Sequence, residues 1–254
     1  ASSSLRGEAG TNSSMTGTSR NPMYNAPGEA HPPKYKPTKQ DNGIRYAARY
    51  LKSLNFISYY LCTSNLLNQQ DTMSGDFISI KIKEVRKETE DAVSILFEHP
   101  DEHKEKLQYK PGQYITIKWM DGAKELRRSY SISSVPDDPY LAITVKEVEG
   151  GKISPLLCRQ LKPGDSLEIM PPEGRFTAEF GQDLKRNIYL IGAGSGITPL
   201  MSIARFVLEK EPKSSVILLY GSRNEAQIIF REEFERMTQK YQNQFFVYHN
   251  VSKT

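Results

Sequence analysis

The sequence has few cysteines and no long apolar run, and each absence excludes a class of protein. Only two cysteines, Cys62 and Cys158, occur in 254 residues. They are too few for a disulfide framework, a four-thiolate zinc site or an iron–sulfur cluster within this chain. No run of about 18 apolar residues occurs, so no transmembrane segment is predicted. A reducing compartment, the cytoplasm, agrees best with this composition.

The net charge of +4 does not indicate a nucleic-acid-binding protein. The positive excess lies within residues 1–72, whereas acidic and basic side chains balance over residues 73–254. The basic field that DNA or RNA binding requires is therefore not expected on the folded part. The length allows two domains, and 37% hydrophobic residues is adequate for a packed core.

Residues 1–72 differ in composition from the rest of the chain. Residues 1–43 are rich in Ser, Gly, Pro and Asn, which predicts disorder. Residues 44–61 place apolar side chains at spacings of three and four beside basic ones, which predicts one amphipathic helix. Such a helix could contact a membrane surface, act as a targeting peptide or pack on the next domain. Because the chain begins with Ala and Met73 precedes the first strand, we favour a leader that is not native.

Residues 75–181 alternate apolar and polar side chains with a period of two, beginning at Ile78, Ile80 and Ile82. Further short strands are expected at "AVSILF", "GQYITIKW", "RRSYSIS", "LAITVKEV" and "SLEIM", each bounded by Gly, Pro or Asp turns. Many short strands with regular turn signals predict an antiparallel barrel or sandwich.

Residues 185–254 follow the order strand, loop, helix, strand, helix, strand. The strands are "NIYLI", "SVILLYGS" and "QFFVYHNVS", and the helices are "LMSIARFVLEK" and "EAQIIFREEFERMTQKYQ". This order predicts a parallel sheet with helices on its faces. A dinucleotide-binding sheet usually has five or six strands, so this domain is expected to be incomplete.

A glycine-rich turn, "GAGSGITP", joins the first of these strands to its helix. Gly192, Gly194 and Gly196, with Ser195 between them, would let backbone N–H groups approach a pyrophosphate at the helix N-terminus. Thr198 places a hydroxyl at the mouth of this site. The sixth position of the usual G-x-G-x-x-G pattern is not glycine, so a plain strand-to-helix turn is the alternative.

The second strand of this domain ends in Ser222 and Arg223 rather than in an acidic residue. An Asp or Glu at that place would bind the ribose of NADH, whereas a hydroxyl and a guanidinium suit a 2′-phosphate. The sequence therefore favours NADPH over NADH, and an exposed basic pair without a ligand is the alternative. Arg231 is a further candidate for the same phosphate, or else a surface partner of Glu235.

The stretch "RRSYSISS" and the loop "EGGKISP" suggest a second anion site on the barrel. Because successive side chains of a strand point to opposite faces, Arg128 and Tyr130 are expected on one face and Ser131 on the other. Ser154 is a candidate N-cap with Pro155 at the first helical position, so a second helix N-terminus could receive a phosphate. Two anion sites on one chain suggest two nucleotide cofactors.

The ordered motifs "RRSYSISS", "VEGGKIS", "MPPEGRF", "GAGSGITP" and "YGSRN" resemble the ferredoxin–NADP reductase superfamily. Within it they are most similar to the reductase component of phenylacetyl-CoA oxygenases, and to phenol hydroxylase and flavohaemoglobin reductase modules. The resemblance implies an antiparallel Greek-key FAD-binding barrel followed by an α/β NAD(P)-binding domain. It covers residues 75–254.

The resemblance also implies roles for individual residues. Arg128 would pair with the FAD pyrophosphate, Tyr130 would pack on the isoalloxazine, and Ser131 would lie near flavin N5. Thr198 would lie near the nicotinamide, so Tyr130, Ser131 and Thr198 are the residues expected at the reacting atoms. The remaining cofactor contacts fall in two groups: Val145, Lys146, Gly151, Lys152, Ile153 and Ser154 for FAD, and Gly192, Gly194, Ser195, Gly196, Ser222 and Arg223 for NADPH.

The expected activity is electron transfer from NADPH through FAD to an iron–sulfur or haem acceptor, as the reductase of a multicomponent oxygenase. A [2Fe–2S] cluster is expected only on a C-terminal domain that this chain lacks, since neither cysteine fits its spacing. The histidines need no catalytic role, and no metal site is predicted. Three alternatives stay open: a flavin-binding module that turns nothing over because its nucleotide domain is incomplete, a reductase module of another family member of the ferredoxin or flavohaemoglobin type, and a nucleotide-regulated interaction protein that docks through its N-terminal helix.

Overall fold

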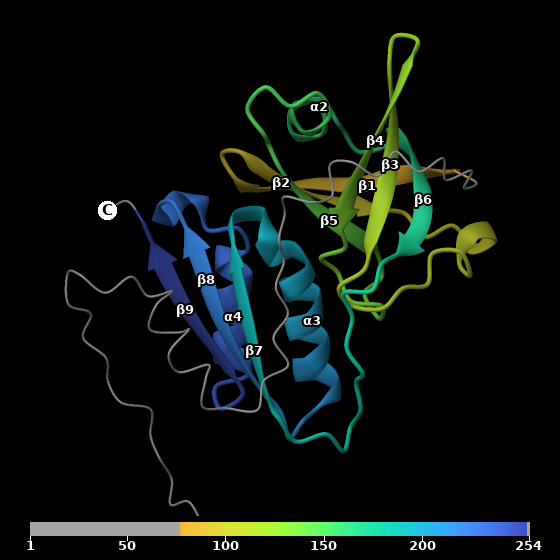
Figure 1. Cartoon of the computed structure of the whole chain (residues 1–254). Helices are drawn as coiled ribbons and strands as arrows, with labels where there is room; N and C mark the ends of the chain where they lie inside the picture. Colours follow the sequence, from red (N-terminus) through yellow and green to blue (C-terminus); the bar gives the residue numbers. More distant parts are fainter. Residues whose placement is uncertain (1–76, 253–254) are drawn as a thin grey trace, which may run out of the picture. The chain divides into compact units, whose positions relative to one another are not determined.

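The computed structural model describes residues 77–252 (Figure 1). The predicted N-terminal leader and its amphipathic helix lie outside these residues. Two sheets form the described part, one of six antiparallel strands and one of three parallel strands. The predicted fold class, an antiparallel β domain followed by an α/β domain, is confirmed. The boundaries predicted for the two domains stay a prediction.

The antiparallel sheet runs in the order β4-β3-β6-β1-β2-β5. Its edge strands meet through a bridge between Ile132 and Ile143, which closes the sheet into a barrel. The strands are β1 (Ile78–Thr89), β2 (Ala92–Phe97), β3 (Tyr114–Asp121), β4 (Lys124–Ser131), β5 (Leu141–Lys146) and β6 (Ser166–Glu173). Two short helices join them, η2 (Asp101–His103) and α2 (Ser154–Arg159).

The period-two pattern of β1 explains how the barrel core forms. Ile78, Ile80 and Ile82 are buried, while the polar residues between them face solvent. Ile80 lies opposite Leu167 of β6 in the antiparallel register. Burying each such side chain contributes about 1.5–3 kcal/mol, so this face holds the register of the whole sheet.

Strand β6 is longer than the sequence predicts. The prediction ends it at "SLEIM", before Pro171 and Pro172, but the strand continues to Glu173. The register with β3 shifts here, because Tyr114 pairs with Glu173 while Thr116 pairs with Met170. The two prolines therefore occupy a bulge, where a missing N–H removes no ladder hydrogen bond.

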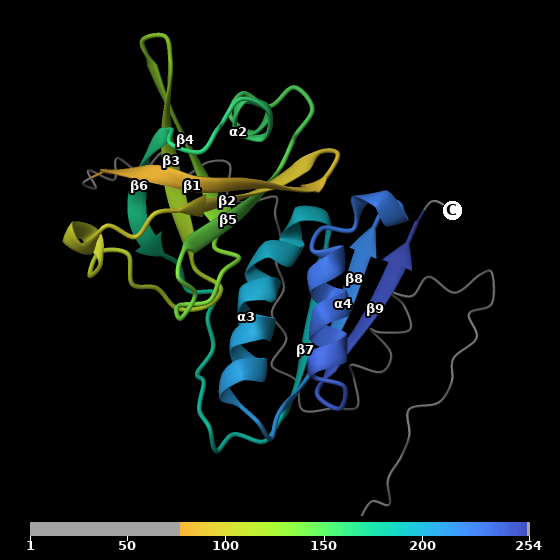
Figure 2. The ribbon, with the colours of Figure 1, turned by 180° about the vertical axis from the view of Figure 1, so that it is seen from behind.

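The parallel sheet has the order β7-β8-β9, with strands β7 (Asn187–Ala193), β8 (Ser215–Ser222) and β9 (Phe245–Val251). Helices α3 (Ile197–Lys210) and α4 (Arg231–Lys240) connect them. Consecutive right-handed crossovers in one direction put both helices on the same face, and α4 lies in front of the sheet in Figure 2. Two 3₁₀ turns follow the strand ends, η3 (Gly194–Gly196) and η4 (Glu225–Gln227).

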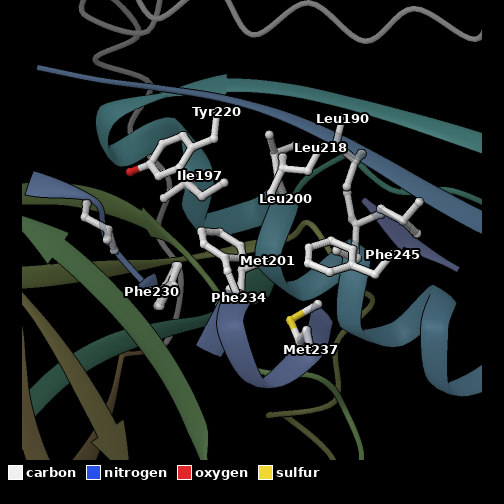
Figure 3. Packing of buried hydrophobic residues seen from close by; sticks show 14 of the residues in the cluster. Leu190, Ile197, Leu200, Met201, Leu218, Tyr220, Phe230, Phe234, Met237 and Phe245 are labelled. Carbon is white, nitrogen blue, oxygen red and sulfur yellow. The ribbon is translucent and has the colours of Figure 1, made fainter. Parts of the chain in front are cut away.

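The helix-covered face of the parallel sheet carries the core of this domain. Tyr220 and Leu218 of β8 pack with Leu200 of α3 and with Phe234 of α4 (Figure 3). The opposite face is less covered, since Ile191 is 49% and Tyr248 is 50% exposed. The helices thus fix one face of the sheet and leave its carboxyl edge open to the loops that follow each strand.

The segment "EAQIIFREEFERMTQKYQ" is not one helix, so this part of the prediction is wrong. It begins with the turn η4, passes through extended Ile228 and reaches Phe230 in the left-handed region at φ 65° before α4 starts. Ile228 and Ile229 are both buried, and the left-handed conformation of Phe230 after them interrupts the helical backbone. Tertiary burial of the two isoleucines outweighs helix propensity here.

Candidate flavin and nucleotide site

The end of β4 presents the predicted flavin contacts. Arg128 is exposed, and its guanidinium donates to the backbone oxygen of Arg127 at 2.7 Å. Among residues 77–252 no carboxylate forms a salt bridge with Arg128. A surface cation without an acidic partner can neutralise a phosphate at little cost. Arg128 is therefore available to the anion that the sequence predicts for it.

Tyr130 packs against the barrel core while Ser131 pairs with Tyr114 in the ladder between β3 and β4. Burial raises the pKa of Tyr130 to about 12, so its hydroxyl stays protonated at neutral pH. The Tyr130 side chain thus combines an apolar ring with a neutral hydroxyl that can donate a hydrogen bond. Such a ring is suited to pack against a flat heterocycle and not to exchange protons.

Ser154 does not cap helix α2, which corrects the prediction. The cap position is Ile153, and the Ser154 hydroxyl accepts a hydrogen bond from the Val148 backbone N–H at 3.0 Å. Ser154 closes the loop instead, and a Cβ on Gly151 would meet the Val148 oxygen at 2.8 Å. The loop backbone therefore needs glycine at 151, while the first N–H groups of α2 have no partner within the helix.

The side chains of four other predicted flavin contacts are buried or already paired within the protein. Val145 and Ile153 are buried in the barrel core, so only their backbones could touch a ligand. Lys152 forms an ion pair with Asp121 at 2.7 Å. Lys146 is held by Asp91, at 2.7 Å from Oδ2 and 2.9 Å from Oδ1. The predicted pyrophosphate contact of this loop accordingly rests on backbone amides.

Glycine occurs at positions 192, 194 and 196 of the nucleotide loop for a different structural reason in each case. A Cβ on Gly192 would meet Leu200 Cδ1 at 2.7 Å, so Gly192 allows α3 to pack on β7. Gly194 has φ +54°, which favours glycine. A Cβ on Gly196 would meet nothing within 4 Å. The protein itself therefore does not require glycine at 196, whereas a ligand lying against this backbone would.

Thr198 lies deeper than the sequence predicts. Its side chain is buried, and its hydroxyl donates to the Ser195 backbone oxygen at 2.5 Å. Tyr220 donates to the Gly194 oxygen at 3.0 Å. Both hydrogen bonds stabilise the backbone of η3, so Thr198 contributes to the conformation of the loop. Its hydroxyl proton is already donated within the protein.

The end of β8 has the properties of a nucleotide site. Ser222 is only 9% exposed, and its Oγ has no hydrogen-bond partner among the described residues. Arg223 is exposed, with no salt bridge in that part of the chain. The Ser252 backbone N–H donates to the Ser222 oxygen at 3.0 Å, which brings the end of β9 alongside. Ser252 was missed by the sequence reasoning.

Arg231 is less available than Arg223 to bind a nucleotide phosphate. Its guanidinium lies 3.9 Å from Glu225 and 3.5 Å from Glu235, so it resembles the surface partner that the sequence left open as an alternative. Burial and then the nearby Arg231 charge lower the pKa of His249. The cation of Arg231 therefore lies toward β9 and its own helix.

Asp91 and Gln227 are further site candidates that the sequence reasoning missed. Gln227 Nε2 in η4 donates to Asp91 Oδ2 at 3.3 Å, a contact between residues 136 positions apart. Burial opposes ionisation of Asp91, but the hydrogen bonds from Lys146 and Thr89 outweigh it and hold its pKa below the usual range. No sequence signal distinguishes this aspartate from any other turn residue.

A cavity of about 680 Å³ lies elsewhere, between β1, β2 and helices α3 and α4. Its charged side chains neutralise one another: Arg205 pairs with Asp138 at 2.6 Å and Arg236 pairs with Glu233 at 2.7 Å. Of the residues that the sequence proposes for a cofactor, only Arg231 lines it, beside Ile228 and Phe230 of the segment before α4. This cavity is therefore not the site that the motifs indicate.

Metal-binding and membrane-spanning features are absent from residues 77–252. Within that range no group of three or more His, Cys, Asp or Glu side chains could hold a metal ion. In the same part of the chain, no helix is long and apolar enough to cross a membrane. The chemistry to be explained thus lies in the two loop systems described above.

Family models match both halves of the described chain. Residues 79–178 match the oxidoreductase FAD-binding domain, and residues 190–254 match the oxidoreductase NAD-binding domain. The chain therefore pairs a flavin-binding with a nicotinamide-nucleotide-binding domain. The two domains occur in the order that the resemblance to the ferredoxin–NADP reductase superfamily predicts.

Curated relatives include components of oxygenase systems. The chain is 36% identical over 167 residues to one subunit of the 1,2-phenylacetyl-CoA epoxidase from Escherichia coli, covering 65% of this chain and 46% of that protein. It is 37% identical over 174 residues to the ferredoxin reductase component of 3-ketosteroid-9-alpha-monooxygenase from Rhodococcus rhodochrous, covering 68% and 48%. The chain thus spans about half the length of the curated relatives it matches.

Solved structures share the fold. The flavohaem-like FAD/NAD-binding domain of nitric oxide dioxygenase from Vibrio cholerae has a TM-score of 0.61 and 26% identity, covering 69% of this chain and 74% of that one. The ferredoxin–NADP⁺ reductase from Plasmodium falciparum has a TM-score of 0.60 at 21% identity, covering 70% and 75%. At that identity the second likeness shows the fold alone.

Proposed function

We propose that this chain is the FAD- and NADPH-binding part of a reductase that delivers electrons to an oxygenase through an iron–sulfur or haem acceptor. The observation that carries the proposal is that one chain presents two groups suited to anions: Arg128 at the end of β4, without an ion-pair partner among the described residues, and an open glycine loop after β7. The monooxygenase reductases among the relatives support the choice of acceptor. The cytoplasm is the proposed location, since Cys158 is a free thiol.

The residues present fit both cofactors. The Arg128 guanidinium, which has no ion-pair partner within residues 77–252, would face the FAD pyrophosphate, with the backbone of Gly151–Ser154 as a second support, and Tyr130 would pack on the ring. Open space at Gly196 and the unpartnered Ser222 hydroxyl fit a dinucleotide along the carboxyl edge of the parallel sheet. Bound FAD would accept a hydride from the reduced nicotinamide and release the electrons singly.

The protein side chains would orient the cofactors and supply charge, not act as acids or bases. Tyr130 stays protonated because burial raises its pKa, and the Thr198 proton is committed to the Ser195 oxygen. Neither residue is poised to move a proton near neutral pH. The proposed preference for NADPH rests on Arg223, which is exposed beside Ser222 with no acidic residue at the strand end.

The direct test is FAD retention by the purified chain. We expect flavin absorbance near about 450 nm, a general flavin property, and weaker retention in Arg128→Ala. Losing a charge-assisted contact costs about 1.5–3 kcal/mol, which is roughly 10–100-fold in affinity. Arg127→Ala is the matched control on the neighbouring position of the same strand. A folded wild-type protein that binds no FAD would disprove the proposal.

A second candidate is a flavin-binding module that does not turn over. The exposure of Ile191 and Tyr248 favours it, because among residues 77–252 both helices of the parallel sheet lie on one face, whereas a dinucleotide-binding sheet usually carries helices on both faces. Single-turnover reduction by NADPH separates the candidates. Flavin that binds but is not reduced supports a flavin-binding module without turnover, and flavin that is reduced supports the reductase.

A further inference from the structure

Asp91 lies at the turn between β1 and β2 and, besides the neighbouring Thr89, binds two side chains from distant elements. Its Oδ2 lies 2.7 Å from Lys146 Nζ at the end of β5 and accepts from Gln227 Nε2 at 3.3 Å. Lys146 belongs to the barrel and is one of the predicted flavin contacts. Gln227 belongs to the loop that leaves β8 through Ser222 and Arg223. The Asp91 carboxylate therefore connects a predicted flavin contact of the barrel with the loop that follows the predicted nucleotide contacts of β8.

The same hairpin holds the other end of this loop. Glu88 Oε2 accepts from the Phe230 backbone N–H at 3.3 Å, while Glu88 Oε1 accepts from the Ser94 hydroxyl at 2.6 Å. Phe230 has φ 65°, a strained conformation for a bulky residue, directly before α4. Ala92 is buried within the nucleotide-domain core. The end of the β1–β2 hairpin thus clamps residues 227–230 at both ends.

Two buried side-chain oxygens within the described residues lack a hydrogen-bond partner, Ser222 Oγ and Gln227 Oε1, and both belong to the loop at residues 222–230. An unmet buried polar atom costs about 1–3 kcal/mol and calls for an explanation. Because the ionised Asp91 can only accept, the amide nitrogen of Gln227 must face it, and the oxygen is turned to the other side. The loop therefore has hydrogen-bonding capacity that the protein does not use.

Two other contacts between the barrel and the nucleotide domain do not involve residues that are predicted to bind a cofactor. Arg205 binds Asp138 with both terminal nitrogens, at 2.6 and 2.8 Å, and Ser202 donates to the Ser134 oxygen at 2.5 Å. Both come from the middle of α3, and neither touches a predicted cofactor contact. They can serve as reference contacts, since they join the same two domains away from the site.

We propose that Asp91 is a positioning residue, which orients Gln227 and the 222–230 loop so that a nicotinamide nucleotide bound there is aligned with the flavin beside Lys146. The proposal rests on the proposed function. It assigns no chemical step to Asp91. Removing the link should leave FAD bound and the nucleotide less well aligned, because the Asp91 side chain bonds to Thr89, Lys146 and Gln227 and, among the described residues, neither to Arg128 nor to residues 151–154.

The test uses the whole chain loaded with FAD, three variants of the link and one control variant. Gln227→Glu places a second carboxylate against Asp91, and like charges repel. Asp91→Asn removes the charge. The double variant Asp91→Asn with Gln227→Glu restores an N–H donor facing a carboxylate with the polarity reversed. Asp138→Asn, which breaks the reference contact with Arg205, is the matched control for a loosened domain interface.

We expect Gln227→Glu to retain FAD and to lower the rate of flavin reduction at saturating NADPH by roughly tenfold, as misalignment does. The double variant should recover most of this loss, and Asp138→Asn should lower the melting temperature without changing the rate. A rate that is unchanged in Gln227→Glu, or a loss that the double variant does not reverse, would overturn the proposal.

A second readout does not depend on turnover. Amide hydrogen exchange at residues 227–230 should become faster in Gln227→Glu and return toward wild type in the double variant. Equal exchange in all four proteins would contradict the link. Should wild type bind no FAD, the proposed function fails, and the exchange experiment still decides whether Asp91 holds the loop.

Discussion

Replacing Gly196 by Ala separates the needs of the fold from the needs of a ligand. In the protein alone a Cβ at 196 meets nothing within 4 Å, and the backbone has φ −64° and ψ −7°, which alanine adopts freely. Reduced entropy of the unfolded chain gives about 0.4–1 kcal/mol, and the less favourable alanine at the helix cap offsets it. The expected change in the free energy of unfolding is therefore within about 1 kcal/mol of zero.

Binding should respond differently to the same change. If the dinucleotide lies against the 194–196 backbone, the added methyl group fills the space that it needs, and we expect the NADP⁺ dissociation constant to rise at least roughly tenfold. Thermal unfolding and isothermal titration with NADP⁺ measure the two quantities on one sample. A Gly196→Ala protein that binds NADP⁺ as tightly as wild type would refute the placement of the nucleotide.

Gly192→Ala is the contrasting control. There the new Cβ would approach Leu200 Cδ1 to 2.7 Å, and overpacking of this kind costs about 1–3 kcal/mol. Its melting temperature should fall, whereas that of Gly196→Ala should not. The pair of variants thus tests two glycines of one motif that the structure assigns to different causes.

Three further predictions concern specificity, stability and pH. Arg223→Ala should raise the KM for NADPH roughly 10–100-fold while leaving that for NADH nearly unchanged, and steady-state kinetics with equal effects on both would contradict it. Glu211 is fully buried and pairs with Arg186 at 2.7 Å, so Glu211→Ala should cost about 3 kcal/mol in urea unfolding, more than Glu211→Gln. Because the pKa of Asp91 is lowered in the folded state, its stabilisation is present above its unfolded value of about 3.9 and is lost as pH falls below it. The stability difference between wild type and Asp91→Asn should shrink over that acid range, and a constant difference would refute the ion pair.

Much of the fold could be predicted from the sequence because local signals agreed with tertiary structure. The alternation at Ile78, Ile80 and Ile82 predicted β1, and the glycine turn at Gly192–Gly196 marked the passage from β7 to α3. Both signals depend on side-chain periodicity or on backbone freedom, which are visible one residue at a time. The order of strands and helices along the chain was predicted correctly for this reason.

Predictions failed where a contact distant in sequence decided the local structure. The break between η4 and α4 depends on burial of Ile228 and Ile229 and on Glu88 of the barrel. The hydroxyl of Ser154 had a good capping context but found the Val148 amide instead. The contact between Asp91 and Gln227 joins two ordinary polar residues, so only the folded chain brings it to notice.

The roles given to Arg128, Tyr130 and Ser131 stay predictions, as do those of Ser222 and Arg223. Their common premise is that FAD and a nicotinamide nucleotide bind to this chain together and in contact. Anaerobic addition of NADPH to the FAD-loaded chain measures it directly. Bleaching of the flavin absorbance near about 450 nm within one turnover is the predicted result, and a flavin that stays oxidised in the presence of bound NADPH would contradict it.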